Sequence, residues 1–197
     1  RSTLFPYTTL FRSRSKEMPL GNLVADAYRI KMDTQIGLEN GGGLRSSIKA
    51  GTITLGDVIA VQPNDNNMII LEVTGTELLT MLSKCTAKCP EADGSFPQVS
   101  GLKFTIHTAS HKVTDVMVQD KGADTYQPID PNGKYTVATI DYALSGGFYR
   151  TLQNCKLMSL TDVLGRDALA DYLATNLKGV VPDKYKDVEG RITIVND

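Results

Sequence analysis

The segment from Asn40 to Arg45 combines three consecutive glycines with an arginine, and this combination is suited to binding an anion. Consecutive glycines allow neighbouring backbone N–H groups to point into one concavity. The planar guanidinium of Arg45 can hold a phosphate or a carboxylate through two parallel hydrogen bonds. No Gly-Lys-Ser/Thr follows, so the segment is not a Walker A loop. The residues alone leave two interpretations open, an anion site and a flexible loop.

The histidines and cysteines do not have the number or spacing of a metal site. His107 and His111 are the two histidines of the chain, too few for a dinuclear centre. Cys85 and Cys89 are close in sequence, but no second pair of ligands near them would complete a zinc site. A Cys85–Cys89 disulfide is the alternative, and Cys155 is the third cysteine. We therefore expect no metal and no cofactor bound to this chain.

Length and charge exclude two classes of partner. The net charge of −1 over 197 residues provides no field that would attract nucleic acid or an anionic membrane. No apolar run approaches the roughly 18 residues that a membrane span needs. The length suits one domain. A small-molecule ligand is therefore the expected partner.

The first residues differ in origin from the rest, as we interpret them. Thr3 to Ser13 reads TLFPYTTLFRS and matches, codon for codon, the translation of a common short-read sequencing adapter. We therefore expect residues 1–13 not to be native, and the domain to occupy residues 14–197. Native sequence is then expected to be missing ahead of residue 14.

Hydrophobic periodicity predicts the elements that position the glycine-rich segment. Leu20, Leu23, Val24, Ala27 and Ile30 recur at helical spacing and predict a helix over 19–32. Further helices are expected over 55–61, 76–86 and about 162–177, the last two opened by capping signals at 74–77 and 159–162. Strands are expected over 35–39, 68–73, 99–107, 113–118, 135–140 and 191–195. Helices and strands mix without strict βαβ alternation, which predicts an α+β fold.

Sequence blocks along the chain resemble the 5'-nucleotidase C-terminal domain, known from ecto-5'-nucleotidase and bacterial UDP-sugar hydrolases. The blocks are Leu20-Gly21-Asn22-Leu23, Asn40-Gly41-Gly42-Gly43-Leu44-Arg45, Gly51-Thr52-Ile53-Thr54, Val61-Gln62-Pro63, Glu72-Val73-Thr74-Gly75, Phe96-Pro97-Gln98-Val99-Ser100-Gly101, Tyr135-Thr136-Val137-Ala138-Thr139, Gly146-Gly147 and Glu189-Gly190-Arg191-Ile192. They occur in the family's order and cover residues 14–195. The resemblance implies helices packed on two mixed β-sheets, in α/β/β/α layers.

The resemblance also implies which residues bind substrate. In the family this domain binds the nucleoside and helps to hold the phosphates. The matching positions here are Arg14 and Arg45 on the phosphate side, Asn40 and Gly42 in the loop, and Tyr142, which stacks on the base. Two divalent metal ions are expected on a separate N-terminal metallophosphoesterase domain. The family implies a periplasmic or extracellular location.

Two positions depart from the family pattern. Asn64 follows Pro63, where the family has a second stacking phenylalanine. Phe148 and Tyr149 stand where the family has an aspartate that binds the ribose hydroxyls. We expect Phe148 or Tyr149 to turn inward and to form an aromatic clamp with Tyr142. In the alternative interpretation, Phe148 packs in the core and the pocket no longer takes nucleotides.

The expected function is substrate binding within a 5'-nucleotidase-type enzyme that hydrolyses nucleotides or related phosphomonoesters. This chain alone is expected to be inactive. A free-standing nucleotide- or phosphate-binding module is the alternative, and a degenerate non-catalytic surface protein is a third. Among the acidic residues, Asp26 is expected to pair within the fold, and Glu39 is a candidate for orienting Arg45.

Overall fold

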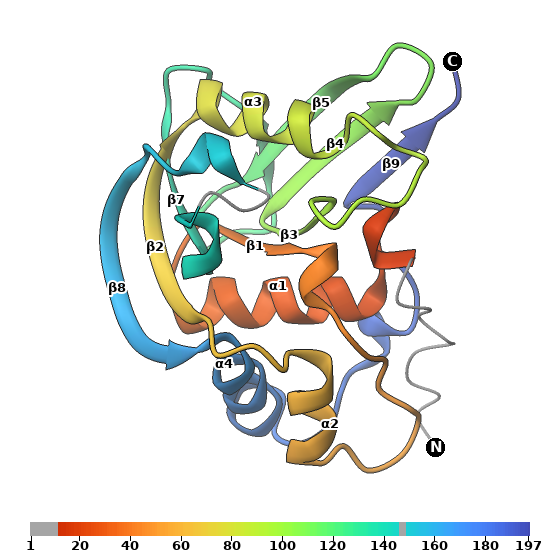
Figure 1. The fold of residues 1–197 in the computed structure, drawn as a ribbon, viewed down its shortest axis with the longest axis vertical. Helices are drawn as coiled ribbons and strands as arrows, with labels where there is room; N and C mark the ends of the chain where they lie inside the picture. Colours follow the sequence, from red (N-terminus) through yellow and green to blue (C-terminus); the bar gives the residue numbers. More distant parts are fainter. Residues whose placement is uncertain (1–11, 146–148) are drawn as a thin grey trace.

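The computed structural model describes residues 12–145 and 149–197 (Figure 1). Within them the chain forms four α-helices and two mixed β-sheets, which confirms the predicted α+β class. Phe148 and most of the suspected adapter translation lie outside the described residues.

The larger sheet has five strands in the order β3-β1-β7-β2-β8. Their bounds are β1 Ile36–Asn40, β2 Asn67–Thr74, β3 Pro97–Ser100, β7 Lys134–Ile140 and β8 Lys156–Leu164. β1 runs parallel to β7, and the other pairs are antiparallel. β8 forms the outer edge of this sheet (Figure 1). The strand β8 was missed, because its Ser159–Asp162 stretch has a helix-capping pattern but pairs with β2 instead.

The smaller sheet has four strands in the order β6-β5-β4-β9. They are β4 Leu102–His107, β5 Lys112–Gln119, β6 Tyr126–Pro128 and β9 Ile192–Val195. The predicted single strand over 99–107 is wrong, because Gly101 divides it between the two sheets. Gly101 has φ +70°, and a Cβ there would lie 2.0 Å from the carbonyl oxygen of Gln35. Only glycine fits this corner.

Local sequence signals set the helix boundaries, with one exception. The helices are α1 Pro19–Lys31, α2 Leu55–Val61, α3 Gly75–Cys85 and α4 Gly165–Asp171. α1 begins with proline at its first turn, and capping boxes open α2 and α3. α4 begins at Gly165 rather than near residue 162 and continues as a π-helical turn, Tyr172–Asn176. None of the helices in the described ranges is long and apolar enough to cross a bilayer.

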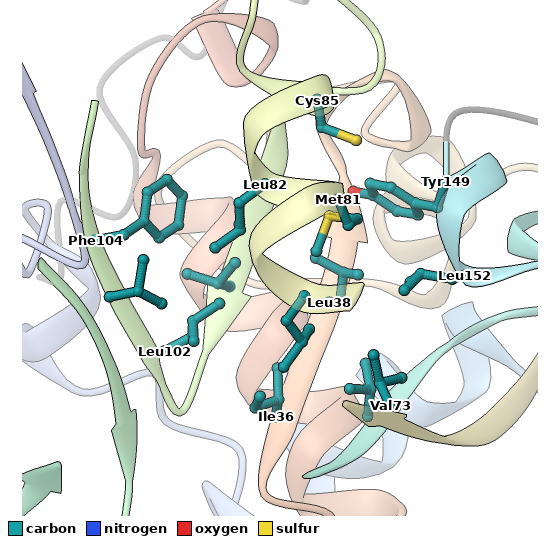
Figure 2. Close-up of a cluster of buried hydrophobic side chains, with 14 of the residues drawn as sticks. Ile36, Leu38, Val73, Met81, Leu82, Cys85, Leu102, Phe104, Tyr149 and Leu152 are labelled. Atoms are coloured by element: carbon teal, nitrogen blue, oxygen red, sulfur yellow. The ribbon is translucent and has the colours of Figure 1, made fainter. Parts of the chain in front are cut away.

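Two hydrophobic clusters fill the fold. The first surrounds α3, which contributes Leu82, and takes residues from both sheets, among them Leu38 and Phe104 (Figure 2). The second lies under α1, α2 and α4, which cover the opposite face of the larger sheet (Figure 1). Cys85 belongs to the first cluster, together with Cys89 and Cys155. All three cysteines are free thiols, so the alternative Cys85–Cys89 disulfide is not formed.

The N-terminal turn η1, Arg12–Arg14, packs on the rest of the domain. Ser13 is buried, and its hydroxyl donates a hydrogen bond of 3.0 Å to the carbonyl oxygen of Gly41. Its own carbonyl oxygen accepts from Nε2 of Gln98 at 2.9 Å. Ser13 thus makes native contacts, contrary to what we expect of an adapter translation. The origin of residues 1–13 stays a prediction.

Candidate ligand-binding site

A pocket of about 480 Å³ opens where β1 and β7 end. It is lined by Arg14, Asn40, Gly42, Gly43, Arg45, Asn64, Asn66, Ile140 and Tyr142. Five of the six residues predicted from the sequence therefore line one cavity, although they span residues 14 to 142. The sixth, Phe148, lies outside the described residues. The volume falls within the roughly 300–1,000 Å³ that is usual for small-molecule sites.

The sheet topology explains why these residues meet. β1 and β7 are parallel neighbours, so the glycine-rich turn η2, Gly41–Gly43, and the turn η3, Asp141–Ala143, emerge at the same edge. β2 begins beside the end of β7, with Met68 paired to Ile140. The segment that leads into β2 therefore also reaches the pocket, and it carries Asn64 and Asn66.

The backbone N–H groups of the glycine turn do not form the expected anion nest. The N–H of Gly41 donates to the carbonyl oxygen of Phe96 at 2.7 Å, and that of Gly42 donates to Gly94 at 3.0 Å. The loop before β3 packs on the turn and occupies both donors. The N–H groups of Gly41 and Gly42 are therefore not available to an anion, and of the residues predicted to bind one, the arginine side chains are left.

Close packing explains the glycines instead. A Cβ on Gly41 would lie 1.9 Å from the carbonyl oxygen of Ser13. On Gly43 it would lie 2.5 Å from Oε1 of Glu39. The backbone clash means that only glycine fits at Gly41, whereas a side chain at Gly43 would have to displace the hydrogen-bonded carboxylate of Glu39.

Asn40 and Arg45 are held in different ways. Nδ2 of Asn40 donates one hydrogen bond to the carbonyl oxygen of Gly94 at 3.0 Å, which fixes the amide and leaves Oδ1 as an acceptor and the second N–H as a donor for a ligand. Arg45 is anchored through its backbone N–H, which donates to Val61 at 2.8 Å. Its exposed guanidinium contacts the carbonyl oxygen of Gly42 at 3.3 Å. The guanidinium therefore keeps several donors for an incoming anion.

The aromatic part of the site differs from the expected clamp. Tyr142 is 40% exposed and lines the pocket, as predicted. Tyr149 is 3% exposed and packs in the first hydrophobic cluster beside Met81 and Cys85 (Figure 2). Tyr149 is therefore not the second ring of a clamp. A clamp formed by Phe148 and Tyr142 stays a prediction.

Asn64 and Asn66 are pocket residues that the sequence reasoning missed. Asn64 was considered only as the loss of a stacking ring, yet it lines the cavity, as Asn66 does. Both offer amide groups that can donate to and accept from a polar ligand. The run of asparagines after Pro63, at the end of a helix and ahead of a buried strand, was the available signal.

Glu39 lies directly beneath the glycine turn and is completely buried. Its carboxylate accepts hydrogen bonds from the hydroxyl of Tyr28 at 2.7 Å, from Nε2 of Gln62 at 2.8 Å and from the N–H of Asn40 at 2.7 Å. These partners show that Glu39 does not orient Arg45. Burial raises the pKa of Glu39 to about 7, although the three hydrogen bonds oppose the rise.

The described residues contain no group of three or more His, Cys, Asp or Glu side chains that could hold a metal ion. The donors of this pocket are arginines and amides, which do not suit the metal pair of a phosphoesterase. No chemical step in this part of the chain is therefore assigned to a metal.

The comparisons with known proteins agree with this description. The model of the family "5'-nucleotidase, C-terminal domain" matches residues 3–153. The trifunctional nucleotide phosphoesterase protein YfkN of Bacillus subtilis is 33% identical over 68% of this chain, which spans 10% of YfkN. A 5'-nucleotidase of Vibrio cholerae is 29% identical over 83% of this chain and 28% of its own length. The crystal structure of a 5'-nucleotidase precursor from Thermus thermophilus matches with a TM-score of 0.85 and 32% identity, over 96% of this chain and 38% of that chain.

The fold defines a domain of the nucleotidase type, with a pocket at one edge of its larger sheet as the candidate ligand site. The chain belongs to the 5'-nucleotidase C-terminal domain family. It spans less than a third of the length of both curated relatives named above, and the matches do not include their remaining parts.

Proposed function

We propose that this chain is the substrate-binding domain of a metallophosphoesterase that hydrolyses nucleotides or related phosphomonoesters. One observation carries the proposal: Arg14, Arg45, Asn40, Gly42 and Tyr142 line a single pocket. Two guanidinium groups suit a phosphate, and an exposed tyrosine ring suits the flat face of a base.

The hydrolytic step belongs to the remainder of the enzyme in this proposal. Two divalent metal ions on an N-terminal metallophosphoesterase domain would supply the activated water. The described residues of this chain bind and orient the ligand, with the arginines on the phosphate and the asparagines around the polar edges. The chain by itself is expected to be inactive, and the whole protein to be periplasmic or extracellular.

The proposal is tested by AMP binding to the 197-residue chain and its Arg45 variants. Arg45→Ala should weaken binding about ten- to a hundred-fold, the usual effect of losing a charge-assisted bidentate contact. Arg45→Lys should recover only part of the affinity, because an ammonium group cannot reproduce the planar fork. Isothermal titration calorimetry gives the dissociation constants.

Lys49→Ala is the matched control, because it removes an exposed cation four residues away that does not line the pocket. It should leave the affinity within about two-fold, since exposed charges outside a contact contribute little. Equal losses for Lys49→Ala and Arg45→Ala would mean that net charge attracts AMP and that Arg45 forms no specific contact. If AMP does not bind the unaltered chain, the nucleotide assignment is wrong.

A free-standing binding module is the alternative function, and the same pocket would serve it. The two proposals differ in what the coding sequence ahead of this domain contains. Metal-ligand blocks of the Asp-x-His and Gly-Asn-His kind ahead of Arg14 would support the enzyme, and a signal peptide directly ahead would support the module.

A further inference from the structure

A second, very small cavity lies beneath the ligand pocket. It has a volume of about 10 Å³, close to the minimum that one water molecule needs. It shares Gly43, Asn64, Asn66 and Ile140 with the pocket above it. Glu39 is among the residues that line it. The cavity therefore connects the pocket wall to the buried carboxylate.

Gln62 lies between the pocket wall and Glu39. Only the nitrogen end of its side-chain amide forms hydrogen bonds with described residues. Gln62 is 6% exposed and lines the small cavity. Its Nε2 contacts both the carboxylate of Glu39 and the hydroxyl of Tyr28. Its Oε1 is buried and has no hydrogen-bond partner. An amide that directs its N–H₂ end at two oxygen atoms and its Oε1 at no donor among the described residues needs a physical reason for that orientation.

The charge on Glu39 provides that reason. An ionised carboxylate can only accept hydrogen bonds, so it attracts the N–H₂ end of the Gln62 amide and leaves Oε1 on the other side. A protonated Glu39 would carry an O–H donor. That donor would be satisfied by Oε1 of Gln62 after the amide rotates by half a turn, and Nε2 would then face the cavity.

The groups around Glu39 allow the carboxyl group to titrate. Tyr28 from α1 and Tyr149, just before η4, face it, and burial raises the pKa of both hydroxyls well above the ordinary value, so both stay neutral. Arg166 of α4 lines the same cavity, but its guanidinium is paired with Oδ1 of Asp65 at 2.5 Å. In the described part of the chain, no basic side chain forms an ion pair with Glu39.

We propose that Glu39 and Gln62 form a proton-operated switch beneath the ligand pocket, in which protonation of Glu39 turns the Gln62 amide and loosens the start of the glycine turn. The second effect follows from Asn40, whose N–H donates to Oε1 of Glu39. A hydrogen bond to a carboxylate is about twice as strong as one to a neutral acid. The ionised state therefore holds the turn that carries Asn40, Gly42 and Arg45 in its ligand-ready position.

The regulation of ligand affinity rests on the proposed function, but the switch itself does not. Its first test therefore uses no ligand. Nitrogen-edited NMR spectra are recorded between about pH 5.5 and 8.5, on either side of the Glu39 pKa of about 7. The side-chain amide of Gln62 and the backbone amide of Asn40 should shift together with one midpoint near that value. In Glu39→Gln neither amide should show this transition.

Tyr28→Phe is the second variant. The hydroxyl of Tyr28 lowers the pKa of Glu39, so its removal should move the shared midpoint to higher pH. If the Gln62 amide of the unaltered chain shows no transition between these pH values, or if the transition persists in Glu39→Gln, the switch is wrong.

The second test measures AMP affinity at the same two pH limits. AMP itself loses charge near pH 6, because its phosphate has a second pKa of about 6, so the ratio between the unaltered chain and Glu39→Gln is the informative quantity. Glu39→Gln imitates the neutral acid. Its affinity should equal that of the unaltered chain at the acidic limit and be about five-fold weaker at the alkaline limit, the size of one hydrogen bond.

Glu72→Gln is the matched control for this test, because it makes the same chemical change at a carboxylate on β2 outside both cavities. It should match the unaltered chain at both limits. If AMP binds and the ratio for Glu39→Gln is the same at both limits, the coupling of the switch to the pocket is refuted. If AMP binds neither chain, the proposed function and that coupling are both wrong, and the NMR midpoint decides the switch alone.

Discussion

Asp26 and Glu39 are both buried carboxylates, with 3% and 0% exposure, but their surroundings are opposite. Asp26 on α1 forms a two-point ion pair with Arg191, with N–O distances of 2.8 and 3.0 Å. It also accepts from the hydroxyls of Tyr185 at 2.6 Å and Ser100 at 2.5 Å. Glu39 has comparable hydrogen bonds and no cation among its described partners. The expectation that Asp26 pairs within the fold is confirmed.

The pKa values follow from this difference. Burial alone would raise the pKa of Asp26, but the charge and hydrogen bonds of Arg191, helped by the charge of Lys184 and the hydrogen bond from Ser100, outweigh burial and lower it to about 2. For Glu39, burial is not offset by any positive charge, and the pKa rises to about 7. Asp26 therefore ties the C-terminal segment to α1 as a structural ion pair. Glu39 costs stability when it is ionised, which is typical of a residue kept for function.

The largest expected effect on the free energy of unfolding comes from substitution of Asp26. Asp26→Asn should lower the free energy of unfolding by about 3 kcal/mol, because it removes the buried carboxylate of the two that pair with Arg191 and leaves the guanidinium with Glu189 alone. Urea unfolding at neutral pH measures the change. Asp171→Asn is the control, since it makes the same substitution in the exposed Lys31–Asp171 pair and should cost less than about 1 kcal/mol. Equal losses for the two variants would show that Asp26 is not the structural ion pair described here.

The second expected effect is that of Glu39→Gln on the free energy of unfolding, which is smaller than that of Asp26→Asn and is not destabilising. Glu39 has a folded-state pKa above its unfolded value, so its contribution to stability is complete below about pH 4.5 and is lost as the pH rises through about 7. At pH 8, Glu39→Gln should therefore be neutral or should stabilise the chain by about 1–3 kcal/mol. The gain should vanish at pH 5. Urea unfolding of both chains at the two pH values measures this. A Glu39→Gln variant that is destabilised at pH 8 by as much as Asp26→Asn would remove the contrast between the two carboxylates.

Asp26 contributes to the stability of the fold over a different pH range from Glu39. Its folded-state pKa is depressed, so its contribution is complete above the unfolded value of about 3.8 and is lost as the pH falls through about 2. Asp26 therefore contributes nothing to the change in unfolding free energy between pH 5 and pH 8. The two carboxylates can therefore be separated in one pH series.

The smallest expected effect on stability comes from deletion of the first residues of the chain. Deleting residues 1–11 should leave the melting temperature within about 1–2 °C, because we expect this segment not to be part of the native domain. Deleting residues 1–13 should lower it further, since Ser13 is hydrogen-bonded to Gly41 and Gln98. Differential scanning fluorimetry compares the three chains. A large loss from the shorter deletion would show that residues 1–11 belong to the fold.

Most elements with strong periodicity or caps could be predicted from the sequence, α1, α2 and α3 among them. The errors occurred where a tertiary contact overrode a local pattern. The Ser159–Asp162 stretch resembles a helix start, but Thr161 donates to the carbonyl oxygen of Met68 on the neighbouring strand β2. Gly101 looked like an interior residue of one strand, and it is the corner between two sheets.

The sequence chemistry marked the Asn40–Arg45 segment, but its grouping with Arg14 and Tyr142 was predictable only through the resemblance to a family. Arg14 and Tyr142 are far apart in sequence, and neither has a local pattern that marks a ligand contact. The roles of Gly41 and Gly43 depend on carbonyl and carboxylate groups that approach from other segments. The Glu39–Gln62 contact joins a strand end to a helix end and has no signal in the sequence at all.

The central claim is that the pocket recognises a base as well as a phosphate. Titration of the chain with AMP, 2'-deoxy-AMP and ribose 5-phosphate tests it directly, because the three ligands share the phosphate and differ in base and sugar. Stacking of a base on an aromatic ring contributes about 1–3 kcal/mol in general, Tyr142 is the ring we propose for it, and no aspartate follows Gly146-Gly147 to hold the sugar hydroxyls. We predict similar affinities for AMP and 2'-deoxy-AMP and a clear loss for ribose 5-phosphate. If AMP binds no better than ribose 5-phosphate, the pocket holds a phosphate and does not recognise a nucleotide.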